Sequence, residues 1–159
     1  MTTTSKHYRQ GDVLIERINS LPRKLTKVAL ESGRVILAHG EVTGHAHAFT
    51  ATEADKYVGA DDAEYFEVRG KRMDCTLPIV RRWRSQVMVR HPRLGVIEFA
   101  EADITICGDT AVINGAFALL RHDEHTVQGI PAGIYKGAGA TGTVHQREYS
   151  PEAIRNVAD

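Results

Sequence analysis

Apolar residues in this chain recur in short runs of strand length rather than at helical spacing. Such runs include Val13–Ile18, Tyr65–Val68, Gln86–Arg90 and Gly95–Phe99, and residues typical of turns separate them. Many short strands at this spacing indicate an all-β sandwich or small barrel. The pattern therefore predicts an all-β fold.

The boundaries between runs predict the remaining elements. Lys27–Leu30 and Val35–His39 are expected to form a hairpin, whereas the polar stretch Thr50–Asp62 is expected to be a loop. Turn signals at Gly108-Asp109 and Asn114-Gly115 are expected to break the later strands. One short C-terminal helix is expected, with Ser150 as its N-cap, Pro151 at the first helical position, and Ala153–Ala158 as its continuation.

Length and composition place the chain among ordinary globular proteins. Its 159 residues predict a single domain covering residues 1–159, and its formal net charge is zero. No segment approaches the roughly 18 apolar residues of a membrane span, so we expect a cytoplasmic protein without membrane contact. Cys75 and Cys107 lack C-x-x-C spacing. They are expected to be buried free thiols, with a disulfide between them as the alternative.

Four of the eight histidines fall in two short windows. His45 and His47 form an H-x-H pair, which would place both imidazoles on one face of a strand. His122 and His125 can point the same way if Asp123-Glu124 forms a turn. If the fold joins the windows, these four histidines would bind a divalent metal. The donor set does not distinguish Zn, Fe, Mn and Ni.

A carboxylate near the histidines would complete this site. Glu41 and Glu124 are the candidates, either as a further ligand or as a catalytic base beside a metal that activates water. The alternative is that the histidines are surface or hydrogen-bonded residues with no metal. The sequence assigns no reaction or substrate.

A basic segment offers a second candidate function. From Arg69 to Arg93 there are eight Lys or Arg residues and one acid, Asp74. Within it, Arg81, Arg82, Trp83 and Arg84 combine cations that pair with phosphates and an indole that stacks on a base. They are candidates for nucleic-acid contact, although the favoured interpretation of this segment is one of two others. The alternatives are a solvated strand edge or a surface for an acidic partner.

Two family resemblances bear on the histidines and on the basic segment. The blocks Gln10–Leu14, Gly40–His47, Leu120–His125 and Gln146–Tyr149 resemble a family of small, uncharacterised bacterial and phage proteins. That resemblance implies that the histidines are central, and it leaves about 71–115 as a basic, insertion-like segment. The H-x-H followed by Pro131-Ala132-Gly133 more loosely resembles the cupin pattern, in which Glu53 stands nearest the expected glutamate. This resemblance implies a cupin or jelly-roll version of the barrel.

These resemblances set the functional expectations. The leading one is a metal-binding small β-barrel. The alternative is a non-catalytic phage or mobile-element protein, either a virion component located in the virion or an accessory protein that contacts nucleic acid. Self-association into a homo-oligomer is expected in either case, because β-rich chains with exposed edges often associate.

Overall fold

The computed structural model describes residues 6–40 and 45–137, and nearly all regular structure in these ranges is β-strand. The only helical element there is a 3-10 turn, η1, at Glu101–Asp103. The strands are, in chain order, β1 (His7–Gln10), β2 (Val13–Ile18), β3 (Thr26–Lys27), β4 (Arg34–His39), β5 (Ala46–Thr50), β6 (Ala54–Val58), β7 (Glu64–Val68), β8 (Lys71–Trp83), β9 (Gln86–His91), β10 (Gly95–Ala100), β11 (Thr105–Cys107), β12 (Thr110–His122), β13 (His125–Pro131) and β14 (Gly133–Gly137).

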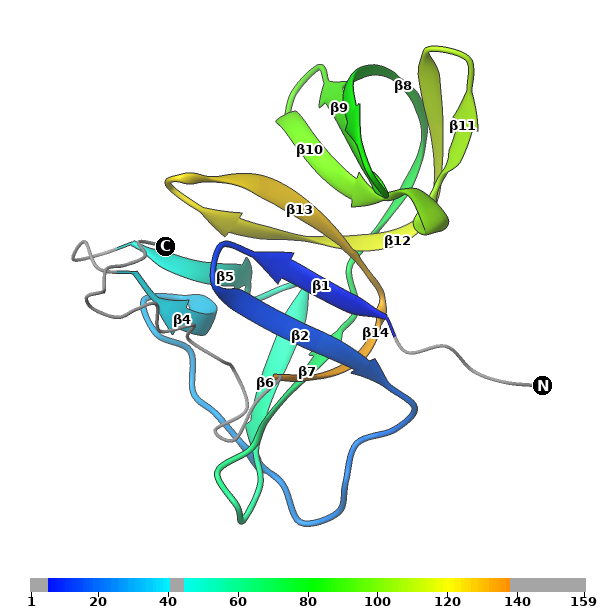
Figure 1. Ribbon diagram of the computed structural model, residues 1–159. Coiled ribbons are helices and arrows are strands. Elements are labelled where there is room, and N and C mark those ends of the chain that lie inside the picture. The colour runs from blue at the N-terminus through cyan, green and yellow to red at the C-terminus, as the bar shows by residue number, and fades with distance from the viewer. Residues whose placement is uncertain (1–5, 41–44, 138–159) are drawn as a thin grey trace.

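Six of these strands form one antiparallel sheet, in the order β1-β2-β14-β7-β6-β3. The last described strand, β14, pairs with β2 on one side and with β7 on the other. The sheet therefore joins the two ends of the described chain, and it forms the lower half of the molecule in Figure 1.

The second sheet closes into a barrel. Its strands run β13-β10-β9-β8-β12, and β12 also pairs with β13, which completes a ring of five strands. Only the β10–β13 pair is parallel. The sheet continues from β12 through β5 to β4, while β11 forms a hairpin with β12. Figure 1 shows the closed part above the six-stranded sheet.

Strand β12 separates two hydrophobic cores. Phe117 and Leu119 point into the barrel, where they pack with Val87, Ile97 and Phe99 among others. Ala118 and Leu120 point the opposite way, into a core between the six-stranded sheet and β4, β5, β12 and β13. Because side chains alternate along a strand, one strand serves as a wall of both cores.

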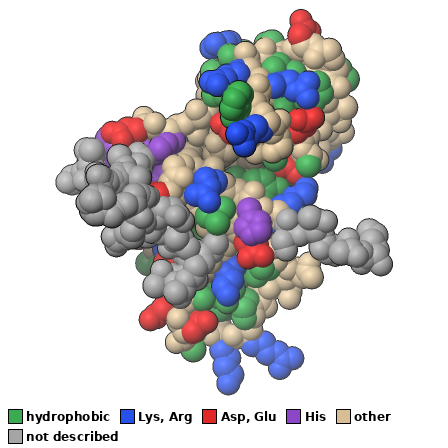
Figure 2. Space-filling view, in the orientation of Figure 1, with side chains coloured by type: hydrophobic (Ala, Val, Ile, Leu, Met, Phe, Trp, Pro, Cys, Tyr) green, Lys and Arg blue, Asp and Glu red, His purple; other side chains and the backbone are tan. Residues whose placement is uncertain are grey.

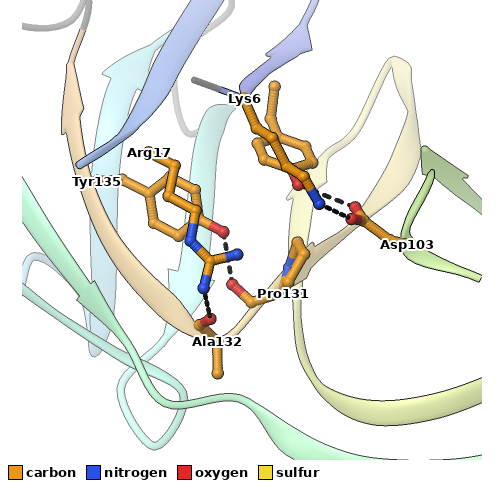
Figure 3. Close-up of polar contacts among 7 residues, drawn as sticks. Lys6, Arg17, Asp103, Pro131, Ala132 and Tyr135 are labelled. Atoms are coloured by element: carbon orange, nitrogen blue, oxygen red, sulfur yellow. Dashed lines mark hydrogen bonds and ion pairs between the residues drawn. The ribbon is translucent and has the colours of Figure 1, made fainter. Parts of the chain in front are cut away.

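Polar contacts also connect the barrel to the six-stranded sheet, as Figure 3 shows. Asp103 lies at the end of η1 with a buried side chain. It accepts hydrogen bonds from Lys6 Nζ at 2.8 Å and from the Tyr8 hydroxyl at 2.9 Å. Near β14, Arg17 donates to the Ala132 carbonyl, and the Tyr135 hydroxyl donates to the Pro131 carbonyl at 2.7 Å. These contacts fix the barrel against β1 and β2.

The all-β prediction is confirmed, and the structure has a closed barrel. Three local predictions are wrong. Lys27–Leu30 and Val35–His39 do not form a hairpin, because β3 pairs with β6 and β4 pairs with β5. Thr50–Asp62 contains strand β6, which is held by pairing with β7, and Asn114-Gly115 lies inside continuous β12 because both residues pair with β8. The block Gln146–Tyr149 and the expected helix at 150–158 lie outside the described residues.

Two further expectations concern the cysteines and the membrane. Cys75 and Cys107 are free thiols, as expected. Cys107 is exposed rather than buried, because it lies at the end of the short β11–β12 hairpin. Burial and the nearby Asp74 carboxylate raise the pKa of the Cys75 thiol. Within the described ranges, no helix is long and apolar enough to cross a membrane.

Candidate metal centre

Three of the four candidate histidines meet where β5, β12 and β13 come together. His47 lies on β5, His122 ends β12 and His125 begins β13. One ring nitrogen from each lies within 4.8 Å of the others. The ring centroids are 4.3 Å apart for His47 and His122, and 4.7 Å apart for His122 and His125. Residues separated by more than seventy positions therefore form one cluster.

A β-bulge in the β12–β13 pair places His125 in this cluster. Leu120 pairs with Gln128, yet His122 pairs with His125, so β13 carries one extra residue between the two pairs. Without it, Thr126 would lie opposite His122. Directly opposite residues of an antiparallel pair share a face, and bulges re-aim side chains in this way. The two-residue turn at Asp123-Glu124 then lets both imidazoles point inward.

Gln10 fixes the protonation of His47. The Gln10 amide nitrogen donates to the carbonyls of Leu120 at 2.8 Å and Thr126 at 3.0 Å, so the amide oxygen faces His47 Nδ1 at 2.9 Å. An oxygen can only accept, so His47 Nδ1 carries the proton and Nε2 presents its lone pair to the cluster. Histidines that bind metals usually donate their other ring N–H to an oxygen in this manner.

His122 has the opposite arrangement. The backbone N–H of Glu124 donates to His122 Nδ1 at 3.0 Å, which leaves the proton of the neutral ring on Nε2. Coordination through Nε2 would need that proton on Nδ1, so the Glu124 amide would have to turn away. Asp123 and Glu124 are both exposed, so this turn can move without disturbing either core.

His125 forms the open side of the cluster. Its ring lies against Gly11, where an added Cβ atom would come within 2.7 Å of His125 Nε2. This nitrogen is buried and has no hydrogen-bond partner among the described residues. The same residue lines a cavity of about 600 Å³ between β1 and the barrel. The cluster is thus closed on the His47 side and reached from solvent on the His125 side.

Asp12 supplies a carboxylate beside His47. Its Oδ1 lies 3.7 Å from His47 Nε2, and its side chain is largely buried. Two donors bound to one zinc ion at about 2.1 Å lie roughly 3.4 Å apart. Asp12 therefore needs only a small shift to share an ion with His47.

The other predicted site residues lie outside the triad. His45 precedes β5, and its Nε2 contacts the Asp123 carboxylate at 3.0 Å. Glu124 Oε2 lies 3.7 Å from His45 Nδ1, so its carboxylate is beside His45. Glu41 falls outside the described residues. Glu53 accepts a hydrogen bond from the Leu119 backbone at 3.2 Å. The basic residues at 81–84 lie at the β8–β9 turn, on the barrel.

Sequence reasoning missed Gln10, Gly11 and Asp12 as site residues. Gln10 ends β1 and Gly11-Asp12 form the β1–β2 turn, more than thirty positions before His47. The available signal was the block Gln10–Leu14 within the family resemblance, which grouped this turn with the histidine blocks.

Comparisons with known proteins identify a family and no activity. No curated protein and no solved structure matches the chain. A model for a domain of unknown function, DUF8820, matches residues 9–101, which include Gln10, Asp12 and His47 and end before His122. Because this match covers more than half of the chain, the protein belongs to the DUF8820 family of domains of unknown function.

Proposed function

We propose that this protein binds a divalent transition-metal ion through His47, His122 and His125, with Asp12 as a fourth ligand. The observation that carries the proposal is the approach of three imidazoles to within 4.8 Å in a largely buried setting. Three nitrogens and one carboxylate suit Zn²⁺, Fe²⁺, Mn²⁺ or Ni²⁺. The choice among these ions is left to measurement.

The tautomer of His47 supports the proposal independently. Gln10 directs the lone pair of His47 Nε2 into the cluster, and Asp12 Oδ1 lies at 3.7 Å from the same nitrogen. His47 is therefore preorganised to bind a cation through Nε2. The cavity beside His125 would give water or a small ligand access to the ion. There the ion would act as a Lewis acid or lower the pKa of bound water.

The competing interpretation is a structural histidine cluster without metal. The lone pair on His47 Nε2 and the proton on His122 Nε2 are complementary, so the two rings can satisfy each other. Buried polar groups are generally paired in this way. The two interpretations differ in one respect, because only the metal-binding cluster gains stability when a metal ion is added.

Metal content and affinity test the proposal. We expect purified protein to contain close to one equivalent of a single transition metal by mass spectrometry. Apoprotein should bind Zn²⁺ or Co²⁺ by calorimetry and gain thermal stability on binding. Substituting His47→Ala or His125→Ala should weaken binding by more than the roughly 10- to 100-fold cost of losing an outer-shell partner.

His39→Ala is the matched control. His39 lies on β4 and is exposed, and its side chain pairs with Glu31 at 3.0 Å. Its loss should leave metal binding unchanged. Equal metal content in wild-type protein, His47→Ala and His125→Ala would contradict the proposal, and so would the absence of any thermal shift with all four ions.

A further inference from the structure

The outer face of the barrel carries a row of side chains in register across four strands. Arg81 on β8 pairs with Met88 on β9, Met88 pairs with Glu98 on β10, and Glu98 pairs with Gln128 on β13. Their neighbours Val87, Val89, Ile97 and Phe99 fill the barrel core, so this row faces outward. It crosses three strand spacings, or about 14 Å.

A second β-bulge exposes Trp83 at one end of this row, and we call this exposed indole the aromatic platform. Ile79 pairs with Val89 but Arg81 pairs with Met88, so one extra residue lies between them on β8. Regular alternation from Ile79 would turn Arg81 and Trp83 into the barrel. The bulge turns both outward instead, and Trp83 is 60% exposed.

Two guanidinium groups lie beside this indole. Arg81 Cζ is 5.8 Å and Arg84 Cζ is 5.6 Å from the centroid of the Trp83 ring. Arg84 adopts a left-handed backbone conformation, with φ of 58°, in the tight β8–β9 turn. Arg82 points elsewhere, because its guanidinium pairs with Glu101 at 3.1 Å. Figure 2 shows Lys and Arg side chains clustered around apolar surface on this upper part of the molecule.

Two adjoining cavities continue from the platform toward the histidines. One, of about 220 Å³, is lined by Arg81, Trp83 and Met88, and it shares Gln86 and Glu98 with the second cavity, of about 600 Å³. The second is also lined by Arg9 of β1 and ends at His125. Together they form a groove from Trp83 to His125, which we call the barrel groove.

We propose that the barrel groove binds single-stranded nucleic acid. The cations Arg9, Arg81 and Arg84 would pair with phosphates along the strand, while one base stacks on Trp83. Gln86 and Glu98, both partly exposed, offer the donors and acceptors that read the edges of unpaired bases. In this arrangement Glu98 accepts from an exocyclic amino group.

The shape of the groove favours a single strand over a duplex. Trp83 can stack only on a base that is not already stacked between its neighbours, and the hydrogen-bonding side chains lie within the groove. The strand order β12-β8-β9-β10 is that of a Greek key. Five-stranded Greek-key barrels that bind oligonucleotides use the face of their second and third strands, here β9 and β10. That likeness is an analogy of fold and adds no residue to the argument.

This proposal does not depend on a bound metal. The platform and the row Arg81–Met88–Glu98–Gln128 contain no histidine, and only the far end of the groove reaches His125. We therefore expect His47→Ala to bind single strands as the wild-type protein does, whether or not the three histidines bind a metal ion.

Fluorescence anisotropy with labelled oligonucleotides of about 15 nucleotides tests the groove. Single-stranded DNA, RNA of the same sequence and the matching DNA duplex are the probes. We expect the single strands to bind more tightly than the duplex, and the ratio of DNA to RNA affinity identifies the preferred sugar. Trp83→Ala should weaken single-strand binding by about five- to a hundred-fold, and Trp83→Phe should restore most of it.

The cations are tested by salt dependence. Replacing Arg81 and Arg84 by Ala should lower the slope of log affinity against log salt by about 0.7 for each phosphate that the protein no longer neutralises. Arg93→Ala is the matched control, because Arg93 is an exposed arginine at the other end of the β9–β10 hairpin. Binding that is absent at low salt, that favours the duplex, or that is unchanged in folded Trp83→Ala protein would overturn the proposal.

Discussion

At the scale of single residues, the glycine in the β1–β2 turn controls the position of His125. Gly11 has a φ of 58°, a conformation that costs an L-residue energy, and its Cα faces the His125 ring. Gly11 has no side chain that could bind a metal ion. Gly11 therefore acts only by leaving room for the imidazole beside His47 and His122.

Gly11→Ala should weaken metal binding without removing a ligand. The new methyl group would come within 2.7 Å of His125 Nε2 and would displace the ring. We expect metal affinity to fall by about 10- to 100-fold, as it does when an outer-shell partner is lost. Calorimetric titration of the apoprotein measures the change.

Gly33→Ala is the control for backbone strain in this experiment. Gly33 also has positive φ, at 75°, yet no described atom lies within 4 Å of the position that an added methyl group would occupy. Both variants should lose some stability, but only Gly11→Ala should lose metal affinity. Equal affinities in the two variants would show that His125 does not need this space.

The residue scale also shows how far sequence reasoning reaches. Strand alternation predicts a shared face for His45 and His47, but His45 precedes β5, so the alternation does not extend to it. The approach of His122 and His125 depends on a bulge, which no local pattern signalled. Gln10 could not be identified as a partner of His47, because that contact exists only once β1 lies beside β13.

At the scale of elements, β12 connects the barrel core to the core below it. Leu119 faces the barrel and Leu120 faces the lower core, and both side chains are buried. Damage to either core therefore reaches the same strand. Because β12 pairs with β8, β13 and β5, its loss would open the barrel and separate β5 and β4 from it.

Leu119→Ala and Leu120→Ala should each destabilise the whole protein in one transition. We expect each to lower the free energy of unfolding by about 2–5 kcal/mol, the range for buried leucine truncations. Calorimetry and urea unfolding followed by two probes should give coincident transitions. A separate early transition in only one variant would show that the barrel unfolds on its own.

An exposed residue on the same strand provides the control for this comparison. Asn114→Ala on the same strand removes an exposed side chain that accepts from Arg72 at 2.6 Å. It should change stability by no more than about 0.5 kcal/mol, as surface substitutions generally do.

Elements were predictable where local sequence determines them. The hairpin of β9 and β10 follows from two apolar runs around a Pro-containing turn. Strand β6 was missed because its sequence is polar. Its charges are matched by partners in space, with Asp55 pairing with Arg69 and Lys27, and Lys56 pairing with Glu64 at 3.4 Å. Pairing of this kind is tertiary, and it outweighs β-propensity.

At the scale of the whole molecule, two buried tyrosines connect stability to alkaline pH. Burial raises the pKa of Tyr8 above its ordinary value of 10.0, and the nearby Asp103 carboxylate raises it further. Burial likewise raises the pKa of Tyr135, although Arg17 opposes the shift. In the unfolded chain both phenols ionise near pH 10.

The free energy of unfolding should therefore fall as pH rises above about 10. In that range the unfolded chain releases protons that the folded protein retains, so alkali favours unfolding. Each retained proton contributes at most about 1.4 kcal/mol per pH unit. Urea unfolding between about pH 8 and pH 11 measures the slope.

Phenylalanine substitutions identify the groups responsible. Tyr8→Phe and Tyr135→Phe should each reduce the slope of the free energy of unfolding against pH above about pH 10, because each removes one titrating phenol. Both should also lose some stability at neutral pH with the hydrogen bonds to Asp103 and Pro131. If the fall in the free energy of unfolding at alkaline pH is unchanged when both tyrosines are replaced by Phe, groups other than Tyr8 and Tyr135 cause it.

The position of β14 has a consequence for how the chain must be made. The six-stranded sheet pairs β2 with β7 only through β14, whose residues are the last described. While a ribosome is still synthesising the barrel, the facing edges of β2 and β7 have no partner. Unpaired edges of this kind recruit other strands and favour aggregation. The nascent protein is therefore most prone to aggregation just before β14 emerges from the ribosome. Once β14 is made, it pairs with β2 and β7 and completes the six-stranded sheet.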